Sequence, residues 1–216
     1  MHGFLLNIFL NHSVMIAAFI AAVRFKTVCK NFQPFILFIW LGFINETISL
    51  VLIYTKGYNT VNSNIYVLLE SIVILYQFYH WETISRHLYY GLLLVAFSIW
   101  TADNLVWHRL SGNNSMFRIA CSFLVIACSL KQVNKLVSCE RVSLIKNPVF
   151  LICTAFLMYY SCKAFVEVFN AWHLQVSLAF NREIFTILYF ADFISNIIYA
   201  IAVLCIPRKQ VFTMQY

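Results

Sequence analysis

Seven apolar segments of membrane-spanning length are spaced along this chain, and they constrain its fold more than any other feature. A helix needs about 20 mostly apolar residues to cross the hydrocarbon core of a bilayer. Polar or turn-rich breaks separate the segments, which cover residues 4–23, 34–54, 65–81, 89–107, 118–137, 148–170 and 183–206. The sequence therefore predicts an all-α, polytopic membrane protein built as a seven-transmembrane-helix bundle.

The composition supports this prediction and leaves no room for a second domain. Hydrophobic residues make up 62% of the 216 residues and charged residues 11%, with a mean hydropathy of +0.79. Seven spans of about 21 residues use roughly 147 positions and leave about 70 for loops and tails. We therefore expect one membrane domain over residues 1–216. The basic residues behind the formal charge of +7 flank apolar segments, so we expect them to contact a lipid bilayer, with no nucleic acid as partner.

The Lys and Arg residues are distributed unequally between the two sides of this topology. One side has ten, namely Arg24, Lys26, Lys30, Arg86, Lys131, Lys135, Arg141, Lys146, Arg208 and Lys209. The other side has four, namely Lys56, Arg109, Arg118 and Arg182. The positive-inside rule then places the N-terminus outside and the C-terminus in the cytoplasm of a multi-pass membrane protein. The first segment lacks a basic leader region, so we expect it to be retained as a helix.

Turn and cap residues mark where several helices begin and end. Gln33-Pro34 and Asn147-Pro148 place proline at the start of a helix. The basic stretch 131–146, from Lys131 to Lys146, is partly periodic and predicts that the fifth helix extends past the membrane. This extension either anchors the helix end with snorkelling lysines or docks a cytoplasmic signalling partner.

Charged residues inside the predicted spans are the candidate functional residues, because a charge in a bilayer needs a partner or a function. They fall in the outer half of the topology and comprise Glu46, Glu70, Asp103, Arg118, Lys163, Glu167 and Asp192. Asn45 and Asn196 lie beside them, with Asn196 one helical turn from Asp192. The sequence therefore predicts an outward-facing polar ligand pocket.

The simplest charge pairs are those close in sequence. Asp103 and Arg118 flank one short loop, and Lys163 and Glu167 are four residues apart on one helix. These pairs leave three acids without a partner, namely Glu46, Glu70 and Asp192. Either some carboxyl groups are protonated, or the cluster attracts a cation or an amine-bearing ligand.

Other interpretations of the cluster remain open. Buried polar side chains commonly join membrane helices by hydrogen bonds. An ion or proton pathway would also need ionisable groups in the inner half, which only His80 and His87 approach. Without a second well-spaced ligand near His80 we expect no metal. We expect no cofactor, because a retinal protein would need a lysine in the last helix and Lys163 lies one helix earlier.

Short motifs along nearly the whole chain resemble those of a known family. They are Phe43-Ile44-Asn45-Glu46, Asn62-Ser63-Asn64-Ile65-Tyr66, Leu68-Leu69-Glu70, Asp103-Asn104, Phe117-Arg118, Asn147-Pro148, Lys163, Val166-Glu167, Asn196-Ile197-Ile198-Tyr199-Ala200 and Pro207-Arg208-Lys209. The chain resembles an uncharacterised family of short bacterial heptahelical membrane proteins. The resemblance implies an inner-membrane seven-helix protein and no particular activity.

Three functions are compatible with this sequence. The first is a receptor-like, sensory membrane subunit. Ligand binding would re-pair the charges and shift the last two helices, and a cytoplasmic partner at residues 131–146 would detect this shift. The second is a small-solute transporter. The third is a membrane enzyme acting on a lipid or lipid-linked substrate, although no nucleophile or metalloprotease motif is present. The sequence leaves the oligomeric state open.

Overall fold

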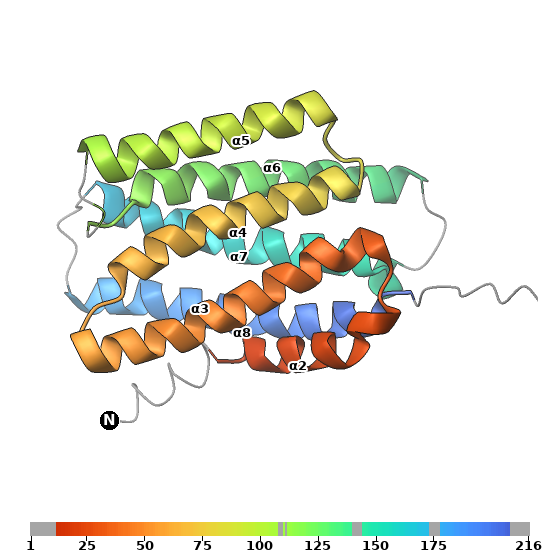
Figure 1. Ribbon diagram of the computed structural model, residues 1–216, viewed down its shortest axis with the longest axis horizontal. Helices are drawn as coiled ribbons and strands as arrows, with labels where there is room; N and C mark the ends of the chain where they lie inside the picture. The colour runs from red at the N-terminus through yellow and green to blue at the C-terminus, as the bar shows by residue number, and fades with distance from the viewer. Residues whose placement is uncertain (1–11, 108–109, 111, 140–143, 173–177, 208–216) are drawn as a thin grey trace, which may run out of the picture.

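The computed structural model is a bundle of helices that run side by side (Figure 1). It describes residues 12–107, 110, 112–139, 144–172 and 178–207. In these residues the chain forms seven α-helices, namely α2 (Val14–Arg24), α3 (Gln33–Lys56), α4 (Thr60–His80), α5 (Arg86–Thr101), α6 (Ser115–Cys139), α7 (Pro148–Ala171) and α8 (Leu178–Cys205). The all-α prediction is confirmed.

Six of these helices, α3 to α8, are long and apolar enough to cross a membrane. The chain is therefore built as a multi-pass membrane protein. The described part of α2 has 11 residues. The rest of the expected first span, residues 4–11, lies outside the described residues, so the seventh crossing stays a prediction. Arg109, Arg141, Arg208 and Lys209 also lie outside them.

The helix boundaries follow from local chemistry. Pro34 stands in the first turn of α3, and the Asn147 side chain caps α7 by accepting a hydrogen bond from the Val149 N–H at 2.9 Å. Gly57 ends α3 with a φ of 79°, a left-handed conformation that glycine adopts without strain. Helix α6 reaches Cys139 in the described residues, and Lys146 lies in the short turn η4 (Leu144–Lys146), so an extension of α6 past the membrane stays a prediction.

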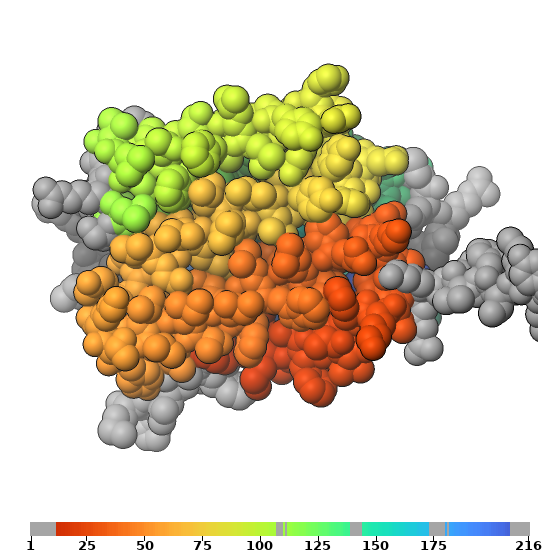
Figure 2. All heavy atoms as spheres, in the orientation of Figure 1, coloured from red at the N-terminus to blue at the C-terminus, as the bar shows by residue number. Residues whose placement is uncertain are grey.

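The bundle has two ends that differ in charge. The basic end holds the α2–α3, α4–α5 and α6–α7 connections and the end of α8, at the right of Figure 1. The Gly57 end holds the α3–α4, α5–α6 and α7–α8 connections, at the left. Helices α6, α7 and α8 pack in sequence, α3 lies between α2 and α4, and α5 packs on α4 and α6. Figure 2 shows the face that α2, α3, α4 and α5 present.

Aromatic rings fill the middle of the bundle on the side toward the basic end. The rings of Phe38 and Phe156 have centroids 5.5 Å apart, and Phe38 also contacts Tyr199 at 5.6 Å. Phe35 lies against the same tyrosine at 5.5 Å, and Phe78 contacts Phe156 at 6.1 Å. Edge-to-face packing of this kind is favourable beyond the area it buries. These five residues form an aromatic layer across α3, α4, α7 and α8.

Arg24 joins the first described helix to the last. Its guanidinium group donates hydrogen bonds to the backbone oxygens of Val203, Leu204 and Ile206. The last carbonyl groups of an α-helix have no partner within the helix, and they carry partial negative charge. A cation at the end of α2 therefore satisfies and neutralises the C-terminal end of α8.

Candidate functional site

A cavity of about 70 Å³ lies near mid-length of the bundle, with room for several water molecules or a small polar group. Three acids border it, namely Glu46, Glu70 and Asp192. The other residues that line it are Val14, Phe38, Ile39, Gly42, Tyr66, Tyr159, Asn196 and Tyr199. The cavity thus combines carboxylates with aromatic and aliphatic walls contributed by α2, α3, α4, α7 and α8.

Glu70 forms a buried ion pair with Lys163. The Lys163 Nζ atom lies 3.0 Å from Glu70 Oε2, and these residues are 5% and 3% exposed. The other carboxylate oxygen accepts a hydrogen bond from the Tyr66 hydroxyl at 3.3 Å. The ammonium also lies over the rings of Tyr159 and Tyr160, at 5.2 and 5.1 Å from their centroids. The charge of Lys163 is therefore matched by Glu70 across helices, rather than by Glu167 on its own helix as we expected.

Asp192 and Glu46 are the other two acids at the cavity. Asp192 Oδ2 accepts a hydrogen bond from Asn196 at 3.1 Å, and Asn196 also donates to the Ser13 hydroxyl at 2.9 Å. Among the described residues, Glu46 has no hydrogen-bond partner, although His12 and Glu70 act on it electrostatically. Neither acid forms an ion pair with a described residue, and the neighbouring Lys163 is already paired with Glu70.

The Tyr199 hydroxyl is another polar group at this cavity. Tyr199 is 4% exposed and lines the cavity, and within the described part of the chain its hydroxyl has no hydrogen-bond partner. Buried polar groups in proteins are nearly always hydrogen-bonded, either to protein or to a bound molecule. The cavity therefore offers both acceptor oxygens and an unused hydroxyl to whatever occupies it.

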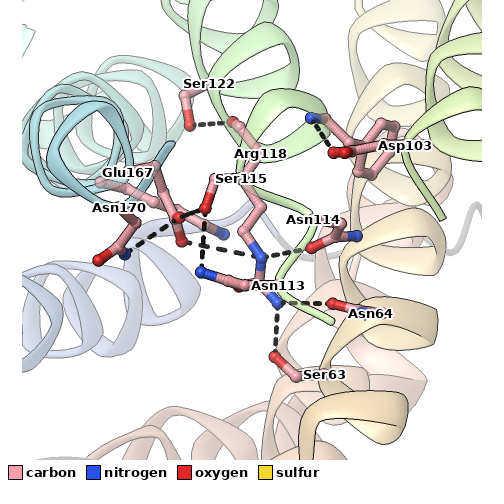
Figure 3. Close-up of polar contacts among 12 residues, drawn as sticks. Ser63, Asn64, Asp103, Asn113, Asn114, Ser115, Arg118, Ser122, Glu167 and Asn170 are labelled. Carbon is pink, nitrogen blue, oxygen red and sulfur yellow. Dashed lines mark hydrogen bonds and ion pairs between the residues drawn. The ribbon is translucent and has the colours of Figure 1, made fainter. Parts of the chain in front are cut away.

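A separate polar network surrounds Arg118 near the Gly57 end (Figure 3). The Arg118 guanidinium donates to Asn114 Oδ1 at 2.6 Å and to Ser63 Oγ at 2.7 Å, and its Nε lies 3.7 Å from Glu167 Oε1. Glu167 also accepts a hydrogen bond from Ser115 Oγ at 2.8 Å. Arg118 thus ties α6 to α4 and α7, which is the role of interhelical glue.

Asp103 and Asn45 also have structural contacts. Asp103 lies in the π-helical turn η3 (Ala102–Trp107) that follows α5. Its Oδ2 accepts a hydrogen bond from the Phe117 N–H at 2.8 Å, so a carboxylate stands at the positive end of α6. Asn45 accepts a hydrogen bond from Asn62 at 2.8 Å, which joins α3 to α4.

The nine candidate residues therefore divide between two places. The cavity brings together Glu46, Glu70, Asp192 and Asn196, with Lys163 paired to Glu70. The remaining four, Asn45, Asp103, Arg118 and Glu167, lie in interhelical contacts. Sequence reasoning missed the cavity tyrosines, namely Tyr66, Tyr159 and Tyr199. Helical spacing from the predicted residues was a usable signal, because each tyrosine stands three or four positions from Glu70, Lys163 or Asn196.

Comparisons with protein-family models, with curated proteins and with solved structures found no match. The resemblance to short heptahelical proteins stays a prediction.

Proposed function

We propose that this protein is a receptor-like, sensory membrane subunit that binds a small ligand carrying an ammonium group. The observation that supports the proposal is the charge at the cavity. Glu46 and Asp192 border it, none of the described residues that line it is basic, and the neighbouring Lys163 is already paired with Glu70. A cationic group would supply the charge that these two acids lack.

The cavity walls favour an organic cation. Ammonium groups bind well over aromatic faces, and the rings of Tyr66, Tyr159 and Tyr199 line the cavity. An ammonium group would donate hydrogen bonds to Glu46 and Asp192, while the Tyr199 hydroxyl would meet a polar atom of the ligand. The volume of about 70 Å³ matches a small amine or the end of a longer one.

We further propose that the ligand enters from the Gly57 end and that this end faces outward. The aromatic layer closes the cavity on the side of the basic end, and the excess of Lys and Arg at that end favours a cytoplasmic position in the inner membrane. Asp192 on α8 and Lys163 on α7 would respond to ligand binding together. A cytoplasmic partner at the basic extension of α6, around Lys131 and Lys135, would detect the shift.

The test is binding of small alkylamines to the purified protein in lipid nanodiscs, measured by calorimetry and by the shift in melting temperature. Alcohols of the same length serve as neutral controls. We expect the amines to bind and the alcohols not to bind, and Glu46→Gln and Asp192→Asn to weaken binding about tenfold or more. Glu183→Gln, an exposed carboxyl on the same helix as Asp192, should leave affinity unchanged. Equal binding of amines and alcohols would overturn the proposal.

Transport of a small solute is the second candidate, and the position of the cavity favours it. Transporters commonly bind substrate near the middle of the membrane, and this cavity lies near mid-length of α3, α7 and α8. The aromatic layer would then have to open toward the basic end. Uptake of labelled amine into proteoliposomes, abolished by Glu46→Gln or Asp192→Asn, would favour transport. Binding without uptake would leave the receptor function.

A further inference from the structure

At the basic end, a hollow of about 400 Å³ opens between the end of α4 and the last turns of α6. His80, Trp81 and Glu82 line it from the α4 side, and Gln132 and Lys135 from α6. A second hollow adjoins it and shares His80 and Glu82. This region shares no lining residue with the acidic cavity, although Lys131 and Lys135 also belong to the part of α6 where the proposed function places a cytoplasmic partner.

Trp81 carries an unused hydrogen-bond donor at this hollow. The residue is 8% exposed and lines the hollow, and among the described residues its indole N–H has no partner. The ring is fixed by edge-on contacts with Phe32 at 6.0 Å and Phe78 at 5.8 Å. The Thr83 N–H donates to the Phe78 oxygen at 3.0 Å and closes the turn that ends α4. A rigid donor of this kind is suited to an acceptor oxygen brought by a ligand.

Basic residues border the two adjoining hollows. Lys135 lines the first hollow, and Lys131 and Arg86 line the second. Their side chains are exposed, and Glu82 is the acid that borders both hollows. Three cations therefore border the two hollows against one carboxylate, so the region attracts anions.

Exposed apolar side chains on the helices that carry these basic residues indicate the kind of anion. Leu130 and Val137 on α6, and Leu88 on α5, are large hydrophobic residues with exposed side chains next to the basic positions. In a membrane these side chains would meet acyl chains, while the hollow lies at the level of the head groups. Basic pockets between helices at this level are known to hold anionic lipid head groups.

We propose that this hollow binds the phosphate group of an anionic phospholipid. The Trp81 Nε1–H donates to a phosphate oxygen, while Lys135 at this hollow and Lys131 at the adjoining one neutralise its charge. The acyl chains lie along the exposed apolar side chains of α5 and α6. The bound lipid thereby bridges the end of α4 and the end of α6.

Native mass spectrometry of the detergent-purified protein tests the proposal, with phosphatidylglycerol or phosphatidylcholine added in equal amounts. We expect phosphatidylglycerol to be retained preferentially. Trp81→Phe keeps one aromatic ring and removes the N–H together with part of the indole, so a melting curve first checks that the variant folds, and we then expect about a tenfold loss of this binding. Lys135→Gln, a change at an exposed side chain that folding tolerates, should reduce it as well. Trp172→Phe at the exposed end of α7 and Lys56→Gln at the Gly57 end are the matched controls.

The outcomes separate the possible ligands. Equal retention of both lipids, or Trp81→Phe and Lys135→Gln variants that bind as the unchanged protein does, would overturn the proposal. Inorganic phosphate is the probe for a free anion. Phosphate that displaces phosphatidylglycerol at millimolar concentration, with the same dependence on Trp81, would overturn the assignment to a lipid.

Discussion

Replacement of Lys163 by methionine should destabilise the bundle by about 3 to 5 kcal/mol, because it leaves the Glu70 carboxylate buried without its cation. The two charged atoms lie 3.0 Å apart, and both side chains are almost fully buried. At an effective dielectric constant of about 20, their attraction is roughly 5.5 kcal/mol. Methionine has nearly the same length as lysine and fills the same space. The loss of stability therefore measures the missing positive charge and not an empty cavity.

A double-mutant cycle separates the pair from its surroundings. Glu70→Gln removes the other charge, and the double variant carries two neutral side chains. The double variant should therefore lose about 2 to 3 kcal/mol less stability than the two single losses add up to. The free energy of unfolding is measured by SDS titration in mixed micelles, with helix content followed by circular dichroism. Lys56→Met, at an exposed position, is the control and should change stability by less than about 0.5 kcal/mol. A Lys163→Met loss below about 1 kcal/mol, or additive single losses, would refute the reasoning.

Two further replacements test other buried contacts with the same unfolding assay. Arg118→Lys keeps the charge but loses the planar guanidinium group that reaches Asn114 and Ser63 together. We therefore expect a loss of about 1 to 3 kcal/mol in the free energy of unfolding. Unchanged stability would contradict the role of Arg118 as a link between helices. Gln77→Leu removes the amide that accepts from the Phe35 N–H at 2.7 Å and donates to the Asn31 oxygen at 2.7 Å, so we expect a loss of at least about 2 kcal/mol. If the Gln77→Leu variant were as stable as the original protein, water would have to satisfy the Phe35 N–H and the Asn31 oxygen in place of the amide.

Apolar segments predicted the helices well because membrane spans are long and their composition is uniform. The boundaries were less predictable. Helix α4 begins at Thr60, five residues before the expected start, because Asn62 and Asn64 belong to its first turns. Asn62 donates to Asn45 on α3, and Asn64 donates to the Gly112 oxygen, so these polar residues face protein rather than water. Hydropathy alone excludes such residues from a span.

Five of the nine candidate residues lie at or beside the cavity, but which of them pair was not predicted. The level of Glu46, Glu70 and Asp192 along their helices follows from counting residues. Which faces of two helices meet does not follow, because it depends on how each helix is rotated about its axis. Lys163 therefore pairs with Glu70, 93 residues away in the chain, rather than with Glu167 four residues away. Short sequence separation was a poor guide to partners here.

The contact between Arg24 and the end of α8 also has a consequence for how the protein is made. The carbonyl groups that receive the Arg24 guanidinium lie about 180 residues further along the chain. At a synthesis rate of roughly 5 to 20 residues per second, the ribosome needs about 10 to 35 s to produce them after Arg24. During that interval α2 can pack on α3, but it lacks α8 and the acceptors for its terminal cation. The contact that joins the first described helix to the last can therefore form only after α8 has been made and inserted.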